Sequence, residues 1–560
     1  MTSAAAQDRS ELLFIVDAGT QSIRSSLVDL EGNIQRLVRV PIEPYFSAQP
    51  GWAEQHPDYY WEKLCESSQL LLRESGVDPD RILAAAVTTL RSSVINLDED
   101  GRPLRPAILW IDQRLADVEG WPPAWMRLPM RAVGLYRRLA DLIRNCEANW
   151  IRQNQPEIWE RTHKFLLLSG FFHFKLTGEY TESVGNNMGY LPFDTKTFRW
   201  AGRQSLVWKL FPIERHKLPA LVQPTEPIGR VTEEASRQTG LPRGLVVIAA
   251  AADKACEILG SGCRTPETAC LSYGTMATVG TATPRHVRLK PLLPPYPAAV
   301  PGEYHTEVSI MRGYWLVRWF KEELGFREKL LAEERNVAPE MLFDEMIRPV
   351  PPGSMGLVLQ PYWSPGIFTD CEAKGTITGF GEIHKRAHLY RSILEGLTYA
   401  LKEGAMLIEK KNGVALESLR VSGGGSQSPT VMQITADVFG LPASRPHTYE
   451  TSTLGAAIVA AVGLKLYDGF DGALKAMTRA RDRFEPIPEN SRIYQEIFHR
   501  VYRKMYRKVR PLLKEIQEIT GYPEDPSGAD SRRRKLEAFQ AGSSARFASR
   551  TQGTQDEPEP

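Results

Sequence analysis

Residues 12–24 read LLFIVDAGTQSIR, and the predicted fold follows from this stretch. The apolar run Leu12 to Val16 predicts a short buried strand. A glycine-containing turn leads into a second strand, Ile23 to Leu30, and a third follows, Ile34 to Val40. Short strands joined by tight turns predict a β-meander that opens a larger α/β domain.

The same pattern returns in the second half of the chain. A buried strand is predicted at 245–252 and ends abruptly at Asp253, and another strand follows, Ala269 to Ser272. The turn Tyr273-Gly274-Thr275 then leads into a strand from Met276 to Gly280. An apolar strand, a Gly-Thr turn and a second strand, once in each half, indicate an α/β protein of two related domains that face each other.

The rest of the chain alternates between strand and helix patterns. Strands are predicted at 82–88, 94–97 and 419–422, and helices at 115–180, 388–410, 429–439, 453–462 and 490–520. The apolar side of the last helix comprises Ile497, Val501, Met505, Val509, Leu512 and Ile516. We expect residues 1–10 to form a disordered arm and residues 523–560, rich in Pro, Ser, Gly, Arg and Glu, a disordered tail.

Composition narrows the class of protein. The 560 residues are 42% hydrophobic and carry a formal net charge of +2. The length favours two large domains, and the near-neutral charge argues against nucleic acid or an acidic membrane as the main partner. The opening segment does not resemble a signal peptide, and the longest apolar run is far shorter than the roughly 20 residues of a membrane span, so we expect a cytoplasmic protein.

The six cysteines form no CxxC pair and are predicted to be reduced thiols. Cys256, Cys263 and Cys270 recur every seven residues, which raises the question of a metal site. Zinc sites usually use more closely spaced pairs, so small buried apolar side chains are favoured.

The turn after the first strand contains residues that suit a phosphate group. Asp17 suits a Mg²⁺ ion through its water shell, and free backbone N–H groups, the hydroxyls of Thr20 and Ser22 and the cation of Arg24 together suit a polyphosphate. The alternative is an ordinary hairpin, because turns rich in Asp, Gly and Ser are common.

Asp253 directly follows eight apolar residues, which would place its carboxylate at the mouth of a sheet. Burial raises a carboxyl pKa toward the range in which the group serves as a general base. The alternative is that Asp253 caps a helix starting at Lys254, and position alone does not separate the two.

The segment Gly423 to Ser428 places three glycines between a predicted strand and a predicted helix. This arrangement favours close approach of a ligand to the backbone over a bare sharp turn. The chain has no Walker A, GxGxxG, HExxH or GxSxG sequence, so the common alternative sites lack support.

Together these strings resemble the FGGY carbohydrate kinases, over roughly residues 11–520. The matching segments are 17–24, Gly51 to Gln55 with Pro57, 98–114 (DEDGRPLRPAILWIDQR), 176–179, 375–395 apart from Phe380, and 423–428 with Gln433, Ala436 and Asp437. The resemblance implies two actin-like, ribonuclease H-like domains with a cleft between them. Residues 11–257 would form the N-terminal domain, which binds sugar and phosphate, and residues 258–522 the C-terminal, nucleotide-binding domain.

The resemblance also implies a reaction, the phosphorylation by ATP and Mg²⁺ of a hydroxyl on a small sugar, polyol or sugar acid. Asp253 would accept the hydroxyl proton and Asp17 would hold Mg²⁺. Phosphate and nucleoside contacts are implied for Thr20, Gln21, Ser22, Arg24, Gly274, Thr275, Gly424, Gly425 and Ser428, and sugar contacts for Arg91, Ser92, Trp110 and Asp112. The structural alternatives are a core aromatic role for Trp110 and an ion pair between Asp112 and Arg91. A homodimer is left open.

Four departures from the family pattern fall on the sugar side. They are Lys254, where a neutral residue is usual, Thr89-Leu90, Ile111 and Ser169 to Phe171. Lys254 and Arg91 together would suit a substrate carboxylate. The alternative is that Lys254 points away from the pocket and pairs with Glu257, three residues on along a helix.

Two other classes of protein remain open at this point. A non-catalytic nucleotide-binding scaffold of the same fold would need no base, and a sugar-binding regulator could have lost turnover, as the unusual Lys254 would allow. ATP turnover that depends on an added sugar would distinguish an enzyme from both.

Overall fold

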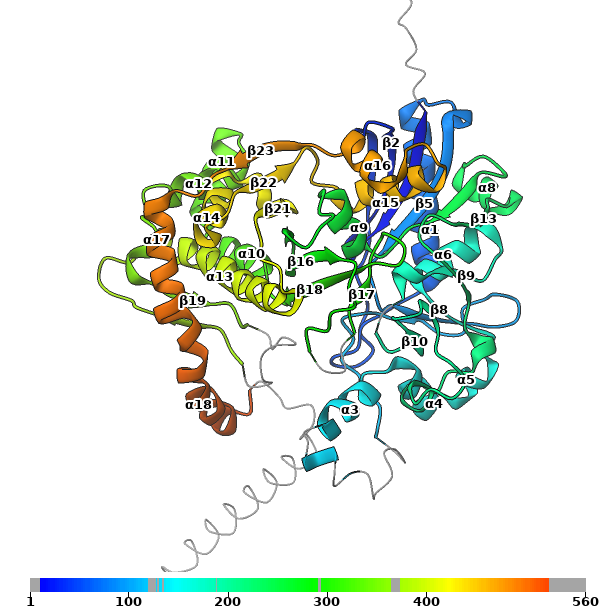
Figure 1. Ribbon diagram of the computed structural model, residues 1–560, viewed down its shortest axis with the longest axis horizontal. Coiled ribbons are helices and arrows are strands. Elements are labelled where there is room, and N and C mark those ends of the chain that lie inside the picture. The colour runs from blue at the N-terminus through cyan, green and yellow to red at the C-terminus, as the bar shows by residue number, and fades with distance from the viewer. Residues whose placement is uncertain are drawn as a thin grey trace, which may run out of the picture.

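A computed structural model of the chain describes residues 11–118, 127, 130–132, 135–187, 189–290, 294–363 and 373–522. The predicted arm at 1–10, the predicted tail at 523–560 and Cys371 lie outside the described residues. Two sheets and the helices that cover them form two lobes side by side (Figure 1).

The first sheet has six strands in the order β13-β14-β5-β1-β2-β3. Their bounds are β1 Leu12–Ala18, β2 Ser22–Asp29, β3 Ile34–Pro41, β5 Ile82–Thr89, β13 Pro227–Arg230 and β14 Val246–Ala249. The meander β1-β2-β3 is antiparallel, and β1, β5 and β14 run parallel. The predicted strands are therefore confirmed, because apolar runs bounded by turns are a local signal.

The second sheet has the same topology with one strand more. Its order is β17-β18-β16-β15-β21-β22-β23, with β15 Thr268–Tyr273, β16 Ala277–Thr283, β17 Tyr296–Pro297, β18 Tyr304–Ile310, β21 Ser418–Ser422, β22 Ala443–Pro446 and β23 Ala480–Phe484. Again a hairpin and a third strand are antiparallel, two parallel strands lie beside the hairpin, and an antiparallel strand follows. The match between the sheets confirms the predicted internal repeat.

The predicted helix at 115–180 is wrong in part. Within the described residues this region contains α3 Leu135–Arg144, α4 Glu147–Asn154, α5 Pro156–Arg161, strand β8 Lys164–Leu167 and α6 Leu168–Thr177. Strand β8 pairs with β6 (Val94–Leu97) in a small sheet with β4 (Glu54–Gln55) and β7 (Ala107–Ile108). Pairing with a distant strand overrides the local helical pattern.

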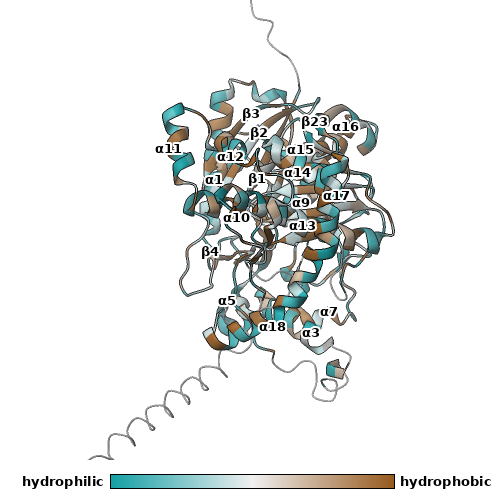
Figure 2. Ribbon diagram, turned by 90° about the vertical axis from the view of Figure 1, so that its left-hand side faces the viewer, coloured by the Kyte–Doolittle hydropathy of each residue, from teal (hydrophilic) through white to brown (hydrophobic). Residues whose placement is uncertain are grey.

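Most helices of the second half are where the sequence predicts them. They are α13 Arg386–Asn412, α14 Pro429–Phe439 and α15 Thr451–Gly463. The predicted helix at 490–520 is instead α17 Pro488–Ile497, a π-helical turn Phe498–Tyr502 and α18 Arg503–Thr520. The wide turn rotates the later residues, so Phe498 and Tyr502 are buried whereas Val501, Leu512 and Ile516 are exposed. Hydrophilic segments lie at the periphery, as on α11 Phe326–Arg335 (Figure 2).

Helix α15 belongs to the second half of the chain but packs on the first sheet. Its Leu454 and Ile458 share an apolar core with Leu13, Ile15 and Val28. In Figure 1 α15 and α16 (Gly469–Met477) accordingly lie beside β2 and β5. The two lobes therefore share one core at their junction.

Helix α9 (Asp253–Gly260) crosses α15 at this junction. A β-carbon on Gly260 would collide with the carbonyl oxygen of Thr451, and one on Gly455 with that of Cys256. Glycine at both positions is what allows the helix backbones to approach this closely.

Candidate active site

Asp17 and Arg24 lie opposite each other in the β1–β2 hairpin. Arg24 Nη1 donates to Asp17 Oδ2 at 3.0 Å and to Glu450 Oε2 at 3.0 Å. Glu450 immediately precedes α15, so the second half of the chain supplies a carboxylate to this end of the first sheet. Burial raises the pKa of Asp17 to about 6, with Arg24 opposing the rise and the carboxylates of Asp253 and Glu450 adding to it.

The turn between β1 and β2 presents the other predicted phosphate contacts. Gly19 N donates to Ser22 O at 3.1 Å, and Ile42 N donates to Gln21 O at 3.0 Å. Thr20 is half-buried, Gln21 is exposed and Ser22 is buried. The backbone is thus the tight hairpin considered as the alternative, and a hairpin does not exclude a ligand at its tip.

The second Gly-Thr turn lies against the triple-glycine segment. The backbone N–H groups of Tyr314 and Trp315 donate to the carbonyl oxygens of Gly274 (3.0 Å) and Thr275 (3.2 Å). The ring of Tyr314 also covers Gly425, where a β-carbon would collide with it. The structure therefore brings two segments together that the sequence predicts as parts of one site.

The triple-glycine segment leads directly into α14. Gly423 has a φ of +80°, and a β-carbon on Gly424 would meet no atom within 4 Å. Ser428 caps α14 by accepting from Val431 N at 3.1 Å, and its hydroxyl donates to the Asp344 carboxylate at 2.7 Å. The backbone at Gly424 is thus open to a ligand.

Asp253 is the first residue of α9, four residues beyond the end of β14 at Ala249. The cap position belongs to Ala252, so the alternative of Asp253 as an N-cap is wrong. Lys254 N donates to Asp253 Oδ1 at 2.7 Å. Burial raises the pKa of Asp253 above its ordinary value, and the Lys254 and Arg91 cations oppose that rise. A carboxylate with a raised pKa is a better proton acceptor than an exposed one.

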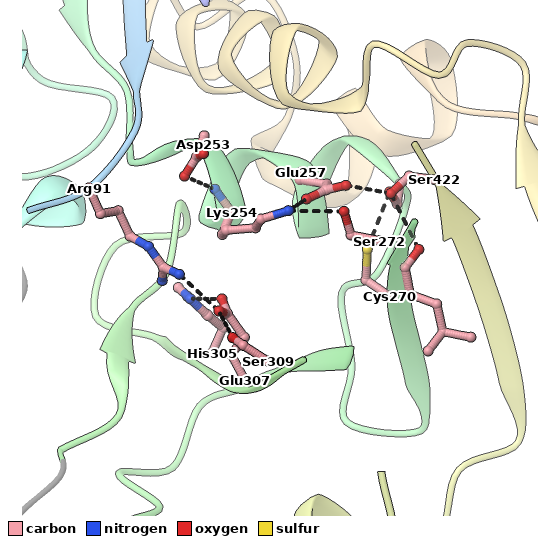
Figure 3. Close-up of polar contacts among 12 residues, drawn as sticks. Arg91, Asp253, Lys254, Glu257, Cys270, Ser272, His305, Glu307, Ser309 and Ser422 are labelled. Carbon is pink, nitrogen blue, oxygen red and sulfur yellow. Dashed lines mark hydrogen bonds and ion pairs between the residues drawn. The ribbon is translucent and has the colours of Figure 1, made fainter. Parts of the chain in front are cut away.

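The side chain of Lys254 extends away from the carboxylate of Asp253 (Figure 3). Its Nζ donates to Glu257 Oε2 at 2.6 Å and to Ser272 Oγ at 2.9 Å. The alternative of a Lys254–Glu257 pair is therefore confirmed, and this cation is already neutralised by a carboxylate of the chain itself.

Arg91 and Asp112 do not pair with each other. Arg91 Nη2 donates to Glu307 Oε1 on β18 at 2.8 Å, which joins the two lobes (Figure 3). Asp112 accepts from Arg114 Nε and Nη2 at 2.8 Å and from Ala53 N at 2.6 Å. The alternative of an Asp112–Arg91 ion pair is wrong, because each residue has a different buried partner.

Ser92 and Trp110 are close in sequence to the other predicted sugar contacts: Ser92 follows Arg91, and Trp110 lies two residues before Asp112. Ser92 has a φ of +58°, an uncommon conformation for a residue other than glycine and one often found at functional sites. Trp110 is partly buried against the core of the first lobe, as in its structural alternative.

Several charged groups at the site were not expected from the sequence. They are Glu307, Glu450 and Asp344. Each lies far along the chain from the residue that it contacts, so no local pattern marks it. Ser272 and Ser422 could have been noticed, since each ends a predicted strand just before a glycine turn.

The cysteines give no support to a metal site. Cys65, Cys146, Cys256, Cys263 and Cys270 are all free thiols. Within the described ranges, no group of three or more His, Cys, Asp or Glu side chains is placed to hold a metal ion by protein ligands alone. The described helices also include none with the length and hydropathy needed to cross a bilayer.

Comparisons with known proteins match nearly the whole folded chain. The N-terminal domain of the FGGY family of carbohydrate kinases matches residues 12–260, and the C-terminal domain of that family matches residues 269–464. An uncharacterized sugar kinase of Escherichia coli is 30% identical over 86% of this chain and 90% of its own length. A xylulose kinase of Lactococcus lactis is 29% identical, over 86% and 94%.

A solved structure gives the same result for the fold. The crystal structure of xylulose kinase from Rhodospirillum rubrum superposes with a TM-score of 0.74 at 26% identity, covering 90% of this chain and all of that one. The protein is a carbohydrate kinase with an ATP-binding fold. The chain belongs to the FGGY family of carbohydrate kinases.

Proposed function

We propose that the protein transfers the γ-phosphoryl group of ATP to a hydroxyl of a small neutral sugar or polyol, with Asp253 as the general base. The observation that carries this proposal is the place of Asp253 on the first turn of α9. Its charge acts on Asp17 in the β1–β2 hairpin, and side chains of the same helix contact Ser272 and Ser422, just before the two glycine turns of the second lobe. Residues 11–257 are proposed as the sugar- and phosphate-binding domain and residues 258–522 as the nucleotide-binding domain.

The carboxylates around Asp17 fit a divalent cation. Asp17 is 4% exposed, and its pKa is raised by burial and by the charges of Asp253 and Glu450. These three carboxylates outnumber the two guanidinium groups bonded to Asp17 and Glu450, those of Arg24 and Arg39, so a cation would relieve their repulsion. Asp17 would hold Mg²⁺, which neutralises charge on the phosphoryl oxygens when bound. Because Arg24 is already bonded to Asp17 and Glu450, we expect it to hold Asp17 in place as well as to face the phosphates.

The proposed reaction needs positioning and charge neutralisation more than covalent catalysis. The hydroxyl oxygen forms a bond to the γ-phosphorus as the bond to the bridging oxygen of ADP breaks, and Asp253 accepts the hydroxyl proton. The turn at Thr20 to Ser22 and the turn at Gly274 and Thr275 would contact the phosphates from the two lobes. Gly424, Gly425 and Ser428 would contact the nucleoside, since the backbone at Gly424 is open.

A neutral substrate is favoured over a sugar acid by the pairing of the two cations near Asp253. Lys254 is bonded to Glu257 at 2.6 Å, and Arg91 to Glu307 at 2.8 Å. A substrate carboxylate entering this pocket would meet cations that are already neutralised, close to Asp253 itself. Neutral hydroxyls, by contrast, can share hydrogen bonds with charged groups at no such cost. Arg91, Ser92, Trp110 and Asp112 remain the proposed sugar contacts.

The test is sugar-dependent release of ADP, measured with a panel of ketoses, polyols and sugar acids. We expect turnover with at least one neutral compound and none above background without sugar. Asp253→Asn should retain ATP binding but lose roughly 10²- to 10⁴-fold in kcat, because it keeps the shape of the side chain and removes proton acceptance. Asp80→Asn, on an exposed aspartate outside the site, is the matched control. Near-normal kcat in Asp253→Asn would refute the assignment.

A further inference from the structure

One buried polar cluster connects the base to both glycine turns. Lys254 Nζ contacts Glu257 and Ser272 as described above, and Ser422 Oγ donates to Glu257 Oε1 at 2.5 Å. These four residues come from α9, from the end of β15 and from the end of β21. Figure 3 shows them as one continuous chain of contacts.

The residues of this cluster are close in sequence to the proposed base or to one of the two glycine turns. Lys254 directly follows Asp253, Ser272 lies two residues before Gly274, and Ser422 directly precedes Gly423. Displacing any one of them would move either the proposed base or one of the turns proposed to hold the nucleotide. We propose that Lys254 and Glu257 are positioning residues that fix the distance between the base and the phosphoryl donor. This inference rests on the proposed role of Asp253.

Stability alone does not account for this cluster. Glu257 and Lys254 side chains are 8% and 17% exposed, and burying an ion pair costs solvation that the mutual attraction often fails to recover. Despite its burial, the pKa of Glu257 is lowered by Lys254, so the pair remains charged in the folded protein. A buried ion pair is best attested as a device that fixes one arrangement among several.

Positioning and substrate binding predict different kinetics. A positioning pair acts in the transition state, so its loss lowers kcat with little change in the KM for sugar or ATP. A direct contact between Lys254 and the substrate would mainly raise the sugar KM. A merely structural pair would lower the melting temperature and leave kcat per folded molecule unchanged.

The experiment compares Lys254→Met, Glu257→Gln and the double variant by steady-state kinetics. The concentration of folded enzyme in each sample is determined by ATP titration, so that kcat is expressed per folded molecule. We expect each single variant to lose about 10- to 100-fold in kcat, with both KM values within about threefold of wild type. The double variant should lose little more than either single variant, because the two residues act as one unit. Lys254→Arg, which keeps the charge, should recover part of the loss.

Two further variants guard against misfolding and local effects. Ser272→Ala removes one hydrogen bond and keeps the Lys254–Glu257 pair, so we expect about a 3- to 10-fold loss in kcat. This variant replaces Lys254→Met as the test if Lys254→Met does not fold. Lys63→Met on α1 (Pro57–Ser75) breaks an exposed Lys–Glu pair of the same spacing, with Glu66, and should leave kcat unchanged.

The inference is overturned if folded Lys254→Met, or Ser272→Ala where Lys254→Met does not fold, retains wild-type kcat while Asp253→Asn is inactive. It is also overturned if the whole effect falls on the sugar KM. If Asp253→Asn itself remains active, the proposed function fails instead, so the two failures are distinguishable.

Discussion

Gly260 of α9 and Gly455 of α15 face each other where the two helices cross, with no side chain on either to hold the backbones apart. The helix that carries Asp253 is thereby packed directly on the helix that follows Glu450. The helix that begins with the proposed base is thus also part of the packed junction between the lobes.

Gly455→Ala should weaken this contact. The added methyl group would collide with the carbonyl oxygen of Cys256, and forcing the helices apart costs about 1–3 kcal/mol, as overpacking in a core usually does. Thermal unfolding measures the loss. Gly472→Ala in α16 is the control: its nearest neighbours would lie at 3.8 and 4.0 Å, so this helical glycine should be replaced neutrally or with a gain in stability. Equal melting temperatures for the two variants would contradict the prediction.

Gly424→Val and Gly425→Ala should impair different properties of the protein, ATP binding in the first and thermal stability as well in the second. A β-carbon at position 424 would meet no protein atom within 4 Å, so the variant should fold normally and bind ATP more weakly. A β-carbon at 425 would collide with the ring of Tyr314, so that variant should lose thermal stability as well. Calorimetric ATP titration and melting curves separate the outcomes. Unchanged ATP affinity in Gly424→Val would argue against a nucleotide at this turn.

Glu307→Gln should change the preference between neutral and acidic substrates. The substitution removes the carboxylate charge that neutralises Arg91, so a substrate carboxylate would meet a stronger positive field. We expect the ratio of kcat/KM for a sugar acid to that for its neutral parent to rise by about tenfold, the effect of one charge-assisted hydrogen bond. Glu303→Gln, which breaks the Arg264 pair, serves as the control. An unchanged ratio would place Arg91 outside the sugar pocket.

Lys402 should make the stability of the protein rise with pH. Its ammonium is buried and donates to Val438 O at 2.8 Å, and burial lowers its pKa to about 8. Because the unfolded chain binds this proton more tightly, the charged form costs stability at pH 7, on the order of 3 kcal/mol, and the cost disappears as pH rises from about 8 to the ordinary value of 10.5.

Lys402→Met should therefore stabilise the protein at pH 7 and flatten this part of the pH profile. Val438 O keeps a donor in Gln495 Nε2 at 3.2 Å, so the variant leaves no orphaned acceptor. Urea unfolding at pH 7 and pH 9.5 is the measurement. If the variant is less stable than wild type at pH 7, the contacts of the Lys402 ammonium outweigh the cost of burying its charge, and the prediction fails.

The sequence alone predicts the parts of the molecule that local patterns encode. The opening strands, the paired Gly-Thr turns and the helix after the glycine triplet are confirmed, because each depends on residues a few positions apart. The Lys254–Glu257 pair was foreseeable for the same reason, since residues three apart share a helix face.

Contacts between residues that lie far apart in the sequence cannot be predicted from local patterns. Arg91 and Glu307 are 216 positions apart, and Arg24 and Glu450 are 426 apart. No periodicity marks such partners. The strand β8 was missed for a related reason, because only its pairing with β6 distinguishes it from a helical segment.

The packing of α15 on the first sheet has a consequence for synthesis on the ribosome. Leu13, Ile15 and Val28 emerge early, but the helix that covers them, beginning at Thr451, is translated only after most of the second lobe. One face of the nascent first lobe must stay uncovered over that whole interval. Exposed apolar strands of this kind invite aggregation and chaperone binding, so the first half of this chain, expressed by itself, should be an insoluble fragment.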